Sequence, residues 1–218
     1  MKKIYIVFPL VFLVVLSIPA YGVRNPTEPE IFKYKESTKP GKYKNWNWTV
    51  NELEIIQSFK ISDYSKIIVF PLNTSRVILP PENDNTYEPT KKVLSHINEI
   101  FIEGLKETIE DKLIIALLEK ENVNNLENLK ADVLIIKLQV IEMNPGSRAL
   151  RFWVGGNIAG RAILETEGEI LNANTKATLL KFKHIYKSHD PGFFSYEKIL
   201  TDIVKKTCET IGEMLFNF

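Results

Sequence analysis

Residues 131–143 have the sequence ADVLIIKLQVIEM, and this stretch decides the fold. Leu134, Ile136, Leu138 and Val140 fall on one face, since successive side chains of a β-strand point to opposite sides. The other face is mixed, with Lys137 and Gln139 among apolar residues. The stretch therefore predicts a strand with one fully buried face.

Two further stretches downstream alternate in the same way. They are RAILETEGEIL at residues 161–171 and ATLLKFKHIY at residues 177–186. The Asn-Ala-Asn-Thr sequence between them, residues 172–175, is typical of a turn because Asn tolerates positive φ. We therefore expect an antiparallel meander of three strands with one charged, solvated face.

The chain upstream of the meander adds a strand and a helix. Lys66–Phe70 is a β-branched run stopped by Pro71, and residues 73–89 are predicted to be a loop. An amphipathic helix is expected from Thr90 to about Asp111. The apolar run Leu113–Leu118 fits either a strand or a continuation of this helix, and the Asp-Lys pair before it favours a strand.

After the meander, residues 196–216 repeat apolar side chains at helical spacing. The order of elements predicts an α+β domain over residues 63–218, with a mixed sheet and helices packed on one face. Cys208, the only cysteine, lies on the apolar stripe of this last helix. It is expected to be a small core residue rather than a reactive thiol.

The N-terminal residues 1–22 have the features of a secretory signal peptide. A short basic start is followed by an apolar run over residues 4–18 and by Ala-Tyr-Gly, which fits signal peptidase cleavage. At about 1.5 Å per residue this run spans roughly 22 Å, which is short for a bilayer core of about 30 Å. The expectation is an exported protein of the periplasm or cell envelope, with a retained anchor as the alternative. No Cys follows the apolar run, so a lipoprotein is not expected.

Residues 23–62 are rich in Pro, Lys and aromatic residues and show no sustained period. We expect an extended arm that forms no core of its own. Its aromatics Tyr43, Trp46 and Trp48 are predicted to tie the arm to the domain surface, and the alternative is a stacking wall for a glycan or a single-stranded nucleic acid. With 44% hydrophobic residues and a formal net charge of +1, the chain gives no overall electrostatic reason to bind nucleic acid.

The connection between the first two meander strands, residues 145–161, is far longer than a hairpin loop of roughly two to five residues. It lacks the spacing of a phosphate-binding or dinucleotide-binding loop. Its glycines permit sharp bends, and its apolar centre lies between arginines. Such an arm packs on a partner chain, enters a lipid interface at the membrane periphery, or folds back on its own domain. The candidate binding residues are Arg148, Arg151, Phe152, Trp153, Gly155, Gly156, Gly160 and Arg161.

The sequence Asn-Pro-Gly-Ser-Arg-Ala-Leu-Arg at residues 144–151 and the glycine-rich residues 154–160 resemble the bacterial domain-of-unknown-function 4410 family. The Asn-rich turn at residues 172–175 and the Gly-Phe-Phe at residues 192–194 are also similar to that family. The resemblance covers roughly residues 65–216. It implies an exported envelope protein without an assigned activity, and many members are similar to lipoproteins. Gly-Asn-Ile-Ala-Gly at residues 156–160 departs from the more regular glycine pattern of the family.

No pattern in the chain indicates catalysis. His184 and His189 have no metal-ligand spacing, and no nucleophile elbow occurs, so no enzyme, cofactor or metal site is expected. Glu165, Glu167 and Glu169 share one face of a strand. Lys181 and Lys183 on the next strand are expected to oppose them in a charge ladder.

Two functions fit these features. The first is a non-enzymatic envelope protein that assembles with itself or with another envelope component through residues 145–161. The second is a small-ligand or glycan-binding module, which requires a concave pocket lined by Tyr43, Trp46 and Trp48.

Overall fold

The structure is a computed structural model. The described residues are 38–46, 49–109, 114–117, 132–147, 149–150, 160–188 and 194–218. The expected signal peptide at residues 1–22 and the expected turn or short helix at residues 121–130 lie outside this part of the chain.

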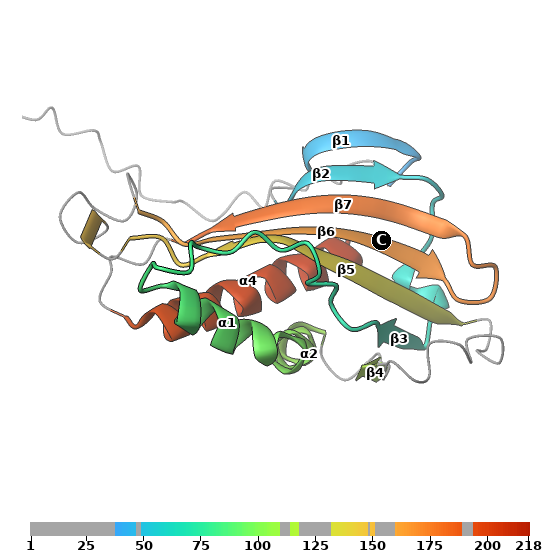
Figure 1. Cartoon of the computed structure of the whole chain (residues 1–218). Coiled ribbons are helices and arrows are strands. Elements are labelled where there is room, and N and C mark those ends of the chain that lie inside the picture. Colours follow the sequence, from blue (N-terminus) through green and yellow to red (C-terminus); the bar gives the residue numbers. More distant parts are fainter. Residues whose placement is uncertain are drawn as a thin grey trace, which may run out of the picture. The chain divides into compact units, whose positions relative to one another are not determined.

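The core element is a seven-stranded mixed sheet in the order β1-β2-β7-β6-β5-β3-β4 (Figure 1). β3 runs parallel to both β4 and β5, and the other neighbours are antiparallel. The strands are β1 (Gly41–Trp46), β2 (Val50–Ile55), β3 (Lys66–Val69), β4 (Ile114–Leu117), β5 (Val133–Asn144), β6 (Ile163–Asn172) and β7 (Thr178–Lys187). The predicted meander is confirmed as β5, β6 and β7, and β4 confirms the strand that was favoured over a helix.

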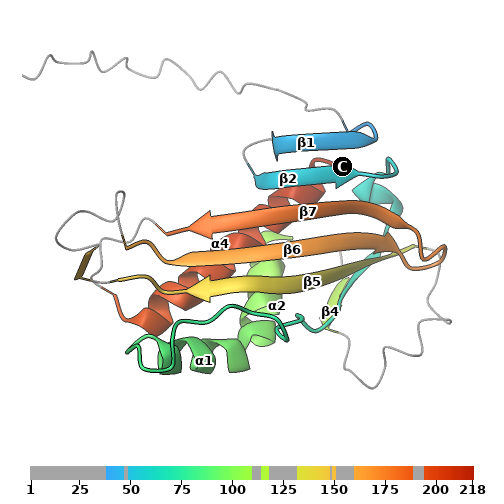
Figure 2. The same cartoon turned by 45° about the horizontal axis from the view of Figure 1, so that its top comes forward.

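The helices α1 (Tyr87–Ser95), α2 (Ile97–Thr108) and α4 (Tyr196–Phe216) cover one face of this sheet (Figure 2). Inward-facing side chains of the sheet and the apolar stripes of these helices form the main hydrophobic core. The α+β class with helices on one face is therefore confirmed. None of the described helices has the length and apolar composition needed to cross a bilayer.

The turn between β6 and β7 forms because Asn172 supplies the hydrogen bonds that the backbone lacks there. Its side-chain Oδ1 accepts from the backbone N–H groups of Asn174 and Thr175, at 2.9 and 3.0 Å. Lys176 takes a left-handed φ of 57° to complete the turn. The predicted turn at residues 172–175 is confirmed.

The prediction of an extended arm is wrong for residues 41–46 and 50–55, which form β1 and β2 of the sheet. These strands are hard to recognise because both are short and half exposed, so neither shows a long apolar run. Their stability comes from pairing, since β2 adds to β7 through Glu52–Ile55 and β1 adds to β2. The contact with β7 is long-range and leaves no local pattern.

The single helix predicted from Thr90 is two helices that meet at His96. The backbone of His96 has φ −115° and ψ 10°, outside helical values, and α1 begins three residues earlier than expected, at Tyr87. The apolar stripe continues through the bend, with Val93 and Ile97 both buried. No Pro or Gly marks the bend, so the periodicity alone concealed it.

Cys208 confirms its predicted place in the core. It is fully buried on α4, and its Sγ donates to the backbone carbonyl of Phe101 on α2 at 3.3 Å. Burial raises the pKa of the thiol well above its usual value. Cys208 is therefore an inert structural residue.

Candidate functional site

The site predicted from sequence falls mainly on residues that the structure does not describe. Gly160 and Arg161 are described and lead into β6. The predicted site residues outside the described part of the chain are Arg148, Arg151, Phe152, Trp153, Gly155 and Gly156.

The two ends of the 145–161 connection meet at Gly146. This glycine has a left-handed φ of 65°, and its N–H donates to Oδ1 of Asn144 at 2.8 Å. A Cβ at this position would overlap the backbone carbonyl oxygens of Gly160 and Arg161. Only glycine permits this approach, so the connection leaves and re-enters the sheet through one narrow neck.

The neck lies at the end of the sheet where β5 and β7 both finish. Asn144, Ile163 and Lys187 are neighbours across β5, β6 and β7. The segments that begin at residues 145 and 188 therefore leave the same end of the sheet. Two apolar side chains near these connections are exposed, Leu150 at 48% and Phe194 at 45%. Both side chains belong to segments that follow strand ends at this end of the sheet.

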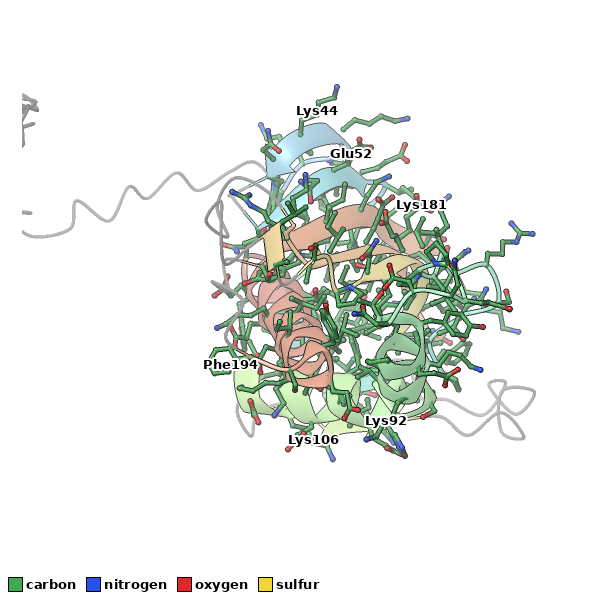
Figure 3. All side chains as sticks on the ribbon, turned by 60° about the vertical axis from the view of Figure 1, so that its left-hand side comes forward. Lys44, Glu52, Lys92, Lys106, Lys181 and Phe194 are labelled. Atoms are coloured by element: carbon green, nitrogen blue, oxygen red, sulfur yellow. The ribbon has the colours of Figure 1, made fainter. Side chains whose placement is uncertain are left out.

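The face of the sheet opposite the helices carries a regular array of charge that we call the charged rows. Each row crosses β1, β2, β7, β6 and β5 through residues that are register partners. The rows are Lys42–Glu54–Lys181–Glu169–Lys137 and Lys44–Glu52–Lys183–Glu167–Gln139. Charge therefore alternates from strand to strand, and Figure 3 shows Lys44, Glu52 and Lys181 on the side away from Lys92 and Lys106.

Ion pairs confirm the predicted charge ladder. Nζ of Lys183 lies 2.6 Å from Oε1 of Glu165, and the hydrogen bond to this carboxylate raises the pKa of Lys183. Lys137 lies 3.5 Å from Glu169 on the other side of β6. The register places Lys181 and Lys183 beside Glu169 and Glu167, while Glu165 has Glu142 of β5 as its partner across the strands.

A groove of about 780 Å³ lies over the charged rows. Its floor is formed by β2, β7, β6 and β5. β1 borders one side, and Phe70, Pro71 and Asn73 border the other. Nζ of Lys137 lies 5.5 Å from the centre of the Phe70 ring, over its face. Because five lysines and four glutamates line the groove, its charges nearly balance.

The aromatic wall required for the ligand-binding hypothesis does not form in the described residues. Tyr43 borders the groove, but its side chain packs against the core, and Trp46 is buried at 1% exposure. Trp46 stacks on Phe218 with ring centroids 5.3 Å apart. Trp46 is therefore a core residue of β1 rather than a contact between an extended arm and the domain surface, and Trp48 lies outside the described residues.

The histidines of the described residues do not converge on a metal site. His96 lies 3.0 Å from Glu99 on the surface, and His184 is buried in β7. Among the described residues, no group of three or more His, Cys, Asp and Glu side chains is placed to bind a metal ion. His189 lies outside the described residues.

The contribution of β1 and β2 to the charged rows was not predicted from the sequence. The signal was present as two period-two patterns, Lys-Tyr-Lys at residues 42–44 and Glu-Leu-Glu at residues 52–54. Opposite charges on two such stretches, separated by a short polar segment, favour a hairpin. The aromatic and Pro-rich surroundings concealed this pattern.

Residues 74–185, about half of the chain, match a family model described as Domain of unknown function (DUF4410). The chain belongs to this family. The match covers α1, α2, β4, β5 and β6 together with nearly all of β7, and it includes the neck. The resemblance stated from the sequence is therefore confirmed. No curated protein matches the chain.

Solved structures with similar folds are distant in sequence. The PelC dodecamer from Paraburkholderia phytofirmans is 10% identical with a TM-score of 0.42, over 73% of this chain and 95% of that one. Protein XCC0632 from Xanthomonas campestris is 11% identical with a TM-score of 0.38, over 70% and 84%. Lipoprotein GNA1162 from Neisseria meningitidis is 10% identical with a TM-score of 0.30, over 60% and 86%.

Proposed function

We propose that this member of the DUF4410 family is an exported, non-enzymatic protein of the cell envelope. In this proposal it assembles with itself or with another envelope component through the end of the sheet that carries residues 145–161. The observation that supports it best is the neck at Gly146, where the backbone holds both ends of the connection together. Export is inferred from the signal-peptide features of residues 1–22.

The neck matters for binding because it fixes the base of the connection. A loop of this length that is attached at two separate points loses much conformational freedom when it binds a partner. The pairing of Asn144 with Ile163 and the close approach of Gly146 to Gly160 hold the base, and this removes part of that entropy cost before binding.

The chemistry at this end of the sheet suits a protein partner. Leu150 and Phe194 expose apolar surface there, and the connection contains Phe152 and Trp153 in its sequence. Aromatic residues and arginine are the residue types most enriched in the centres of protein interfaces.

The test is a Phe152→Ser, Trp153→Ser double variant of the exported chain. We expect it to reduce the mass measured by light scattering, or to abolish recovery of a partner from the native envelope. Phe216→Ser is the matched control, since Phe216 is an exposed aromatic (49%) at the other end of α4.

Unchanged mass and unchanged partners in the double variant would contradict assembly through this connection. If small molecules then shift the amide resonances of groove residues such as Gly168 and Gln139, the ligand-binding hypothesis becomes the better account.

A further inference from the structure

The edge of the sheet at β1 is the second surface that suggests a partner, and it is independent of the 145–161 connection. β1 is the first strand in the sheet order, and no described residue pairs with its outer side (Figure 2). An edge strand presents alternate backbone N–H and C=O groups that point outward without a partner strand. A further extended segment can bond to these groups.

The charged rows are incomplete at this edge. In the inner strands of each row, every charged residue has a residue of opposite or zero charge on both neighbouring strands. The lysines of β1 have an acidic neighbour on one side only, on β2. Lys42 pairs with Glu54 at 3.3 Å and is still 81% exposed. Lys44 is exposed and forms no ion pair with any described residue. The alternation would continue if an acidic strand lay outside β1.

A second copy of β1 does not meet this requirement. Pairing two such edges places lysines next to lysines, and like charges on adjacent strands are destabilising. Exposed lysine on an edge strand is a common device that prevents pairing between copies. The charge therefore selects a different, acidic partner.

The inner face of β1 indicates which residue type should stand between the two acidic residues of a segment that pairs with β1. Tyr43 points to that face and packs against the core. Within the sheet, Lys42, Tyr43 and Lys44 already oppose Glu54, Leu53 and Glu52 of β2. A segment with the order acidic, apolar, acidic would satisfy the outer side of β1 in the same way.

We propose that the β1 edge binds an extended acidic segment of another protein by strand addition, with alternate carboxylates facing Lys42 and Lys44. The contact is short, because Asn45 takes a left-handed φ of 50° and ends the regular edge. A short segment held by backbone hydrogen bonds and surface ion pairs binds weakly and loses affinity as salt is added.

The test uses a short synthetic peptide with Glu-Leu-Glu at its centre and the whole chain. We expect binding that falls with added salt and slows hydrogen exchange of the amides at Gly41–Lys44. A Lys-Leu-Lys peptide and a Glu-Leu-Glu peptide with alternate amides N-methylated are matched controls. Each should bind about tenfold more weakly, since one reverses the charges and the other lacks the backbone donors.

A Lys42→Glu, Lys44→Glu variant should reverse the preference between the two charged peptides. Lys106→Glu with Lys187→Glu makes the same change in net charge away from β1, and should leave the preference unchanged. Equal binding of all three peptides, or slowed exchange elsewhere than in β1, overturns the proposal. Protection of β1 that rises with protein concentration alone also overturns it, because the occupant is then a second copy.

Discussion

Among single residues, His184 is the one whose protonation the fold opposes most clearly. It is 5% exposed on the inner face of β7, opposite Thr166 of β6, and neither ring nitrogen has a hydrogen-bond partner among the described residues. Burial lowers its pKa to about 4. The nearby backbone of Thr49 raises the pKa of His184 by a smaller amount, although it forms no hydrogen bond of normal geometry with the ring.

His184 therefore makes the stability of the protein depend on pH. Because its pKa is about 4 in the fold and 6.5 in the unfolded chain, the unfolded chain binds more protons between these values. The stabilisation is complete above pH 6.5 and is lost as the pH falls towards 4. The pKa difference corresponds to about 3 kcal/mol. Urea unfolding at a series of pH values measures this change in the free energy of unfolding.

The contribution of His184 is separated from that of the carboxylates by a His184→Leu variant. Its free energy of unfolding should lack the part of the pH dependence that lies between pH 6.5 and 4, while the acidic residues titrate as before. Identical pH profiles for the two proteins would show that His184 is solvated or paired in solution.

At the scale of elements, α2 and α4 pack closely where they cross. Gly104 and Gly212 let the helices approach, and a Cβ at Gly104 would meet Cys208 at 3.0 Å. A Cβ at Gly212 would come within 2.5 Å of the Cγ2 methyl of Thr108. Neither glycine has positive φ, so close packing rather than backbone conformation explains both.

Replacing Gly212 with Ala sets two effects against each other. Alanine favours a helix by about 1 kcal/mol over glycine, but overpacking a core contact costs about 1–3 kcal/mol. We expect Gly212→Ala to lower the free energy of unfolding by about 1 kcal/mol, as measured by chemical denaturation. Adding Thr108→Ser removes the clashing methyl and keeps the hydroxyl that donates to the carbonyl of Gly104. The double variant should therefore regain the loss, and a failure to do so would place the strain elsewhere.

The elements differ in how far the sequence predicted them. β5, β6 and β7 were predictable because their alternation is long and their charged face is continuous from Glu165 to Glu169. For β1 and β2 the sequence held only the short hairpin pattern, because β2 pairs with β7 far along the chain and only the register shows that Lys44, Glu52 and Lys183 form one row. The neck was half predictable: the glycines indicated bends, but their approach to each other depends on the β5–β6 register.

At the scale of the whole domain, an aromatic stack joins β1 to Phe218, the residue that follows α4 by two positions. Phe218, which follows α4, lies between Trp46 of β1 and Phe59, with ring centroids 5.3 and 4.8 Å away. Phe59 in turn meets Tyr64 edge to face at 6.1 Å. Because β1 lies at the edge of the sheet and Trp46 is its only buried side chain, this stack holds the β1–β2 hairpin to the rest of the core.

Phe218→Ala should therefore loosen the β1–β2 hairpin more than it loosens the meander. The loss of two stacked contacts is expected to cost about 1–3 kcal/mol. Amide hydrogen exchange should accelerate in Gly41–Ile55 before it changes in β5 or β6, since edge elements open locally at lower free energy than the central strands. Phe216→Ala is the control, because that ring is 49% exposed and its loss should change neither quantity. Equal acceleration in all strands would mean that the hairpin opens only when the whole domain unfolds, so that β1 is as firmly part of the domain as the meander.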